Sequence, residues 1–100
     1  MPGAEPRTSG LRLIPPAGAP IEIASDRTLL GRDPSADIVV NDPSVSRRHA
    51  TFTRTPEGTV VKDVGSLNGT YVNRDLVDQR LLRNGDEVQI GKFRLVYYSA

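Results

Sequence analysis

The stretch Ser46-Arg47-Arg48-His49-Ala50-Thr51-Phe52-Thr53 joins a polar cluster to a segment with the pattern of a β-strand. In its second half, the apolar side chains of Ala50 and Phe52 alternate with threonines, as in a strand with one buried face. Its first half places a hydroxyl, two guanidiniums and the chain's only imidazole within four residues. Guanidiniums match the oxygens of a phosphate or carboxylate, and a hydroxyl adds a hydrogen-bond donor. The stretch therefore predicts an anion-binding loop that leads directly into a strand.

Similar strand-like segments occur on both sides of this stretch. They cover residues 11–14, 21–24, 28–30, 38–40, 50–53, 59–64, 70–72, 87–90 and 93–98, with Leu81-Leu82 as a shorter apolar piece. Turn-forming residues separate them, as in Asn84-Gly85. No long window has the apolar spacing of a helix. These features predict an all-β fold, antiparallel or mixed, made of two packed sheets.

The composition is that of one soluble globular domain. The 100 residues are 37% hydrophobic and 25% charged, which is enough to bury one core. The formal charge is only +1, so nonspecific binding of nucleic acid, which depends on many phosphate contacts, is not expected. The absence of cysteine excludes disulfides and fits a reducing compartment, and no apolar run suits a membrane span or a secretion signal. The sequence predicts a cytoplasmic protein without membrane insertion.

Three polar clusters lie in breaks between the expected strands, at Gly31-Arg32, residues 46–49 and residues 66–70. Loops of a sandwich gather at its two ends, so these clusters can converge on one rim. Their order resembles the core pattern of the forkhead-associated (FHA) domain, which is Gly-Arg, Ser-x-x-His, Asn-Gly-Thr and Val-Asn. Here the last two pieces are Asn68-Gly69-Thr70 and Val72-Asn73. The resemblance covers roughly residues 11–98 and implies an FHA/SMAD-like β-sandwich of about eleven short strands, with binding loops at one end.

The resemblance also implies a function, recognition of phosphothreonine in an extended peptide. A phosphothreonine carries nearly two negative charges and three acceptor oxygens, so its binding site requires guanidinium groups and short side chains that donate hydrogen bonds. The implied phosphate contacts are Arg32, Ser46, Arg47 and Ser66, and the implied contacts to the peptide backbone are Leu67 and Asn68. The implied loop-bracing residues are Gly31, His49, Gly69, Thr70 and Asn73. The expected role is that of an adaptor or regulator in Ser/Thr-kinase signalling.

The partner expected from the resemblance is a phosphothreonine-containing protein or peptide, such as a Ser/Thr kinase or its substrate. No cofactor or metal is expected, since one histidine without paired ligands cannot build a metal site. The rival interpretation is an FHA-like scaffold that binds an unphosphorylated protein surface through its sheet faces. The retention of Arg32, Ser46, Arg47 and Asn68 argues against that rival.

Two enzymatic or nucleotide-binding interpretations are weaker. Ser46, His49 and Asp63 could name a hydrolase triad, but there is no Gly-x-Ser-x-Gly elbow and the histidine follows the serine by only three residues. The loop 65–69 lacks the Gly-Lys-Ser/Thr ending and the helix of a nucleotide-binding loop. The sequence therefore predicts a binding module and not an enzyme.

Residues 1–10 are rich in Pro, Gly, Ser and Thr and predict a flexible N-terminal tail ahead of an FHA domain at 11–98. Residues 45–50, 63–73 and 85–96 look most like the small bacterial FHA regulators, in which a phosphorylated threonine of the tail folds onto the FHA site. Here the candidate phosphosite is Thr8, three residues before the first expected strand. In the FHA fold that the resemblance implies, the chain termini lie at the end opposite the phosphate-binding loops, and three extended residues span only about 10 Å. We therefore expect phospho-Thr8 not to reach the loops of its own chain, although it could engage a second molecule.

Overall fold

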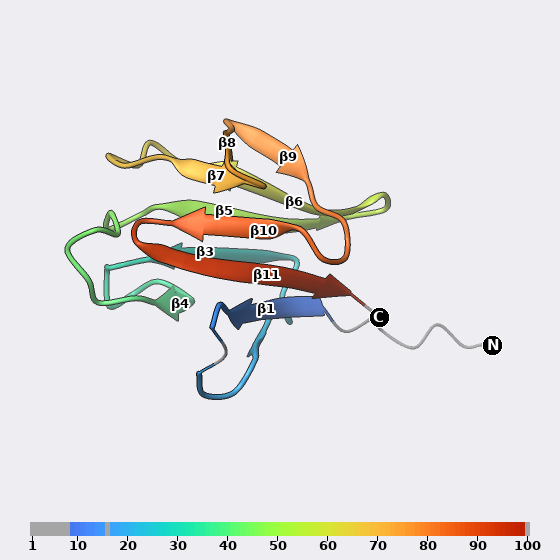
Figure 1. Cartoon of the computed structure of the whole chain (residues 1–100), viewed down its shortest axis with the longest axis horizontal. Coiled ribbons are helices and arrows are strands. Elements are labelled where there is room, and N and C mark those ends of the chain that lie inside the picture. The colour runs from blue at the N-terminus through green and yellow to red at the C-terminus, as the bar shows by residue number, and fades with distance from the viewer. Residues whose placement is uncertain (1–8, 16, 100) are drawn as a thin grey trace.

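The computed structural model describes residues 9–15 and 17–99, and these ranges contain strands and turns but no helix (Figure 1). The strands are β1 (Ser9–Leu13), β2 (Ile21–Glu22), β3 (Arg27–Gly31), β4 (Ile38–Val39), β5 (Ala50–Thr55), β6 (Gly58–Asp63), β7 (Thr70–Val72), β8 (Asp75–Leu76), β9 (Gln79–Leu81), β10 (Glu87–Ile90) and β11 (Phe93–Ser99). Within the described ranges, nothing resembles a helix able to cross a membrane.

The strands form two sheets. One has six strands in the order β2-β1-β11-β10-β7-β8, and the other has five in the order β4-β3-β5-β6-β9. The pairings within the sheets are antiparallel except that of β3 with β4, which is parallel. The prediction of an all-β, two-sheet sandwich of about eleven strands is therefore confirmed.

The apolar faces of the two sheets meet in one core. Its members are Leu11, Ile23, Leu30, Val45, Ala50, Phe52, Val61, Val72, Val77, Leu82, Val88, Ile90, Leu95 and Tyr97. Phe52 is completely buried, and burial of such a side chain contributes about 1.5–3 kcal/mol. The opposite face of β5 is less exposed than its alternation suggested, because Thr51 is 2% exposed between its cross-strand neighbours Leu29 and Lys62.

The first strand begins earlier than the sequence suggested. Ser9 and Gly10 were expected in the flexible tail, but both are buried residues of β1 and pair with Ser99 and Tyr98 of β11. The Tyr98 side chain lies against the Cα of Gly10, so that a β-carbon there would approach its hydroxyl oxygen at 2.5 Å. Glycine is present because of this packing, whereas its usual role as a chain breaker suggested a loop.

Substitution of Gly10 by alanine tests this correction. The added methyl group would overlap the carbonyl oxygen of Ile21 and the ring of Tyr98, and overpacking of this kind costs about 1–3 kcal/mol. We expect a lower urea midpoint with an unchanged slope. Ser25→Ala, at an exposed position between β2 and β3, is the control and should unfold like the unsubstituted protein. Unaltered stability of Gly10→Ala would show that residue 10 belongs to a tail.

The region of β8 and β9 also differs from the expectation. β7 and β8 form a hairpin around Asn73 and Arg74, whose φ angles are 49° and 72°. β8 was not expected from the sequence, because Asn-Arg is not a familiar hairpin signal and β8 itself is only two residues long. β9 ends at Leu81, whereas Leu82 turns into the core and donates its backbone N–H to the carbonyl of Thr59.

The sandwich has two distinct ends. At the left in Figure 1, β3 ends, β5 and β7 begin, and β10 turns into β11. At the right, β1 begins and β11 ends, with Ser9 paired to Ser99. The three polar clusters of the sequence therefore meet at the end of the sandwich opposite Ser9 and Ser99.

Candidate functional site

The loops that follow β3 and precede β5 are joined along their backbones. Arg32 donates its N–H to the carbonyl of Ser46 at 2.9 Å, and Asp33 donates to the carbonyl of Arg47 at 3.1 Å. Gly31 permits this approach, because a β-carbon at this position would overlap the backbone of Arg47. Gly31 is thus required by close packing. We call residues 31–33, 46–49 and 66–69 together the cradle.

His49 connects the second and third loops of the cradle from the inside. Its ring is completely buried; Nδ1 accepts the backbone N–H of Ser46 at 3.1 Å, and Nε2 lies 2.8 Å from the carbonyl oxygen of Gly69. A carbonyl can only accept, so the neutral ring carries its proton on Nε2. Both nitrogens are used in holding the loops, and this geometry supports the bracing role that the resemblance implied.

Asp63, at the end of β6, organises the third loop. One carboxylate oxygen accepts the backbone N–H groups of Gly65 and Ser66 at 2.9 Å each, and the other accepts the hydroxyls of Ser66 and Thr70. From the sequence, the only role considered for Asp63 was that of a triad acid. The sequence Asp-Val-Gly-Ser is nevertheless a signal for a side chain that caps its own turn.

These bonds also rule out the catalytic triad among the described residues. The Asp63 carboxylate contacts Ser66 and Thr70, and His49 receives a backbone N–H of Ser46 while its other nitrogen faces Gly69. The Ser46 hydroxyl accepts the N–H of Leu67 at 2.9 Å. No base is therefore placed to activate that hydroxyl.

The hydroxyl of Ser66 is occupied within its own loop. It donates its proton to Asp63 and accepts the N–H of Gly69 at 2.9 Å. A hydroxyl has one proton, so donation to a phosphate would require the bond to Asp63 to break. In this structure Ser66 is a loop-organising residue, which differs from the phosphate contact that the resemblance implied.

Hydrogen bonds to Asp63 make the folded protein sensitive to acid. Burial raises the pKa of Asp63, but the bonds from Ser66, Thr70 and Gly65 outweigh it and leave the pKa below its usual value. The carboxylate therefore stabilises the fold above the unfolded pKa of about 3.9, and this contribution is lost as the pH falls through the folded pKa.

We expect the urea midpoint to fall between pH 5 and the acid limit of folding, and to fall less in Asp63→Asn, which should already be less stable at pH 7. Asp26→Asn, at an exposed position, is the matched control and should retain the full acid dependence. Identical acid profiles for Asp63→Asn and the unsubstituted protein would contradict the assignment.

Ser46, Leu67 and Asn68 form the outer rim of the cradle. Ser46 uses its hydroxyl as an acceptor for Leu67, which leaves the hydroxyl proton for a ligand. The Asn68 amide donates to the carbonyl of Ser44 at 2.8 Å, so its orientation is set before a ligand arrives, and no bond to its Oδ1 is found among the described residues. The side chain of Leu67 is 89% exposed.

The three arginines of the cradle differ in how they are held. Arg32 is half-buried and donates Nε to the carbonyl of Val45 at 3.0 Å. Arg47 and Arg48 are exposed, and their guanidiniums have no hydrogen bond or ion pair in the part of the chain that the structure describes. The N–H and hydroxyl of Ser35 lower the pKa of Asp33, and the positive charges of Arg47 and Arg48 lower it further.

Ser44 ties the cradle to the β10–β11 turn and was not singled out from the sequence. Its hydroxyl donates to Asp42 at 2.7 Å and accepts the N–H of Lys92 at 3.0 Å. The N–H and hydroxyl of Ser44, together with Lys92, lower the pKa of Asp42 to about 2. A β-carbon on Gly91 would collide with Ser44 at 2.5 Å from its hydroxyl, so the turn fits only glycine.

The remaining bracing residues do not all serve the cradle. Gly69 has φ 87°, and Thr70 is completely buried with its hydroxyl 2.8 Å from Asp63. Asn73 instead bonds Asp86 and the N–H of Glu87 at 3.0 and 2.9 Å, beyond the far end of β7. Asn73 therefore braces the β7–β8 turn, away from the cradle.

The fold and the cradle define a β-sandwich that presents, at one end, two guanidiniums without a partner among the described residues, a hydroxyl and an oriented amide. These features define a class of anion-recognition domain. The sequence model of the FHA domain matches residues 28–91, and the chain belongs to the FHA domain family.

Curated relatives and solved structures agree with this membership. The chain is 50% identical over 107 residues to the glycogen accumulation regulator GarA of Mycobacterium tuberculosis, covering 95% of this chain and 66% of the relative. It is 50% identical over 101 residues to the oxoglutarate dehydrogenase inhibitor of Corynebacterium glutamicum, covering 95% and 70%. The chain thus spans about two thirds of the length of the curated relatives it matches.

Two solved structures have the same fold. One, from a structural and functional analysis of phosphothreonine-dependent FHA domain interactions, superposes with a TM-score of 0.84 at 26% identity and covers 91% of this chain and 95% of the other. The other is Mycobacterium tuberculosis EmbR in complex with a low-affinity phosphopeptide, with a TM-score of 0.86 at 27% identity, covering 91% and 24%.

Proposed function

We propose that this domain binds phosphothreonine-containing segments of partner proteins and acts as an adaptor or regulator in Ser/Thr-kinase signalling. The observation that carries the proposal is the exposed guanidinium of Arg47, unpaired among the described residues, in the same loop as the available hydroxyl proton of Ser46. His49 and Asp63 already fix the loops that carry these groups. Arg32 supplies a second guanidinium, and Asn68 offers Oδ1 to the backbone of the peptide.

The energetics of such a site suit reversible signalling. Each charge-assisted hydrogen bond to the phosphate contributes about 1.5–3 kcal/mol. The desolvation and ordering of an extended peptide offset much of that gain. We expect a net affinity in the micromolar region, or roughly −8 kcal/mol.

Titration with three matched peptides tests the proposal. The peptides share one sequence and carry phosphothreonine, phosphoserine or unmodified threonine, and binding is followed by calorimetry. We expect the phosphothreonine peptide to bind most tightly and the unmodified peptide about 100-fold more weakly or not at all, because it lacks the charge that the guanidiniums match. Equal binding of all three would refute the proposal.

A phospho-independent protein contact is the second candidate. The side chains of Leu67 and Leu76, 89% and 67% exposed, line a hollow of about 360 Å³ beside the cradle, and exposed leucines of this kind favour a protein surface as partner. Equal binding of a protein partner before and after phosphatase treatment would favour this candidate over the first.

The relatives named as a regulator and an inhibitor support a role without catalysis. We place the domain in the cytoplasm, where Ser/Thr kinases use ATP, with a phosphorylated kinase or kinase substrate as partner. Thr8, the candidate phosphosite, lies outside the described residues. Its neighbour Ser9 lies at the end of the sandwich away from the cradle, which supports recognition of phospho-Thr8 by a second molecule and not by its own chain (Figure 1).

A further inference from the structure

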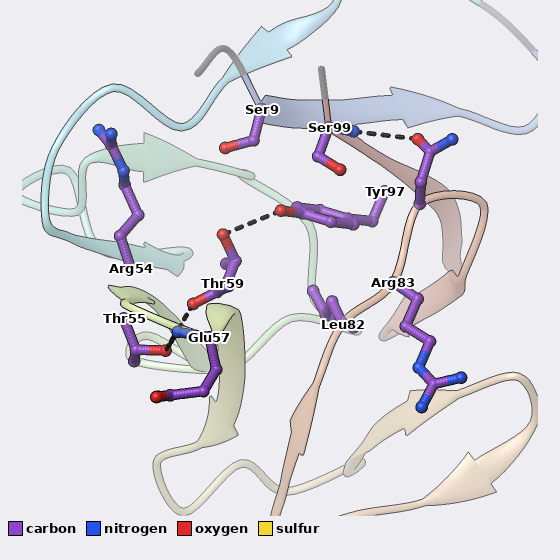
Figure 2. A pocket seen from close by; sticks show the side chains of 11 residues that line it. Ser9, Arg54, Thr55, Glu57, Thr59, Leu82, Arg83, Tyr97 and Ser99 are labelled. Atoms are coloured by element: carbon purple, nitrogen blue, oxygen red, sulfur yellow. Dashed lines mark hydrogen bonds between the residues drawn. The ribbon is translucent and has the colours of Figure 1, made fainter. Parts of the chain in front are cut away.

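A second cavity, of about 290 Å³, lies at the end of the sandwich away from the cradle (Figure 2). Its walls come from both sheets: the beginning of β1 and the end of β11 on one side, and the β5–β6 turn on the other. The cavity lies between these parts of the two sheets. Its volume lies at the lower limit of small-molecule sites.

Five hydroxyl-bearing side chains line this cavity, those of Ser9, Thr55, Thr59, Tyr97 and Ser99. Tyr97, Thr59 and Ser9 are 3%, 3% and 6% exposed, and the Tyr97 hydroxyl donates to the Thr59 hydroxyl at 2.9 Å. Ser9 is more than nine-tenths buried, and no buried side-chain oxygen or nitrogen of the described residues lacks a hydrogen-bond partner. Figure 2 shows the hydroxyls of Ser9 and Ser99 directed into the space beside Tyr97.

Two arginines, Arg54 and Arg83, line the cavity together with the hydroxyls. Arg54 is held in place, because its side chain donates to the carbonyl of Ala24 at 3.1 Å and its backbone N–H to that of Asp26 at 2.8 Å. One guanidinium nitrogen makes that bond, and the remaining N–H groups have no partner in the described residues. Glu57 lies on another part of the wall, also without an ion pair in the described ranges.

These groups define the chemistry of a ligand. Buried hydroxyls both donate and accept, and so they pair with the hydroxyls of a small molecule. A fixed guanidinium pairs best with a carboxylate or phosphate. We propose that this cavity, formed around Ser9, Thr59, Tyr97, Ser99 and Arg54, binds a small hydroxylated oxyanion, with the oxyanion on Arg54 and the ligand hydroxyls on the serines and Thr59.

The test uses a protein whose cradle lacks Arg47, the arginine proposed as the main phosphate contact. Isotope-labelled Arg47→Ala protein is titrated with glycerol 3-phosphate, and amide shifts are followed by NMR. We expect saturable shifts at the amides around Ser9, Arg54 and Ser99. Glycerol has only the hydroxyls and inorganic phosphate only the oxyanion, so each should bind about tenfold more weakly than glycerol 3-phosphate. Equal binding of either fragment would overturn the combined recognition, and unsaturable shifts, or shifts only outside the cavity, would overturn the site.

Two variants locate the binding. Arg54→Gln and Ser9→Ala should each lower the affinity for glycerol 3-phosphate about tenfold. Lys62→Gln removes an exposed cation from β6 that does not line the cavity, and it should bind like the parent. If Arg54→Gln fails to fold, the affinity of Ser9→Ala for glycerol 3-phosphate still tests whether the cavity is the binding site. Unchanged affinity in a folded Arg54→Gln or Ser9→Ala protein would refute the proposal. The outcome is independent of phosphothreonine recognition, because Arg47 is absent throughout.

Discussion

Arg47→Ala is expected to remove phosphothreonine binding while leaving the fold intact. The Arg47 side chain is exposed and has no hydrogen bond or ion pair within the described residues, so its loss costs the folded state little. Its loss would remove up to two charge-assisted bonds to a phosphate, about 3 kcal/mol or more, which corresponds to at least about 100-fold in affinity.

Arg48→Ala is the matched control for this experiment. Arg48 is adjacent and exposed, and its charge also lowers the pKa of Asp33, so both variants remove one positive charge from the same loop. Calorimetry at a fixed salt concentration compares the two variants. If Arg47 contacts the phosphate directly, Arg48→Ala should lower the affinity for the phosphopeptide only a fewfold, whereas Arg47→Ala should lower it drastically. Equal effects of the two would mean that the loop attracts phosphate through its general charge. A folded Arg47→Ala protein with full affinity would refute the role of the cradle.

His49→Ala should produce the opposite pattern, a large loss of stability without the removal of any group that contacts ligand. It leaves a buried cavity and takes away the partners of the Ser46 N–H and the Gly69 carbonyl. Together these losses cost about 3–5 kcal/mol, a large part of the stability of a small domain.

The measurement is urea unfolding at pH 7, followed by peptide titration at a temperature where the variant is folded. His49→Asn is a useful companion, because its amide keeps one donor and one acceptor and should recover part of the stability. A His49→Ala protein as stable as the parent would show that the ring does not hold the loops together. Normal stability combined with lost binding would instead place His49 in direct contact with the ligand.

Much of the fold was predictable because the strands of a sandwich with one buried face carry their own signal. The alternation around Ala50 and Phe52 identified β5, and the run 93–98 identified most of β11. The failures have physical causes. Gly10 occupies a strand because the Tyr98 side chain covers it, a relationship between residues far apart that local propensity cannot reveal. β8 exists because it pairs with β7, and two residues are too few to form a pattern.

The site was predictable only to the level of its loops. The motif residues located the cradle, but the division of labour within it depends on hydrogen bonds between segments distant in sequence. Ser66 resembles a phosphate donor in the sequence, yet its proton is taken by Asp63. Ser44, between a proline and a valine in the sequence, connects the cradle to Lys92 across 48 positions. Such roles follow from the three-dimensional meeting of loops and leave no local trace.

The pairing of Ser9 with Ser99 has a consequence for how this domain can be rearranged. The first and last strands lie side by side, so a short linker could join them and the chain could be opened at another surface turn, such as that between β5 and β6. The cradle would be rebuilt from the same three loops in a different order along the chain. By the same geometry, the domain could be inserted into a loop of a host protein, with its recognition loops facing outward and unobstructed by the host.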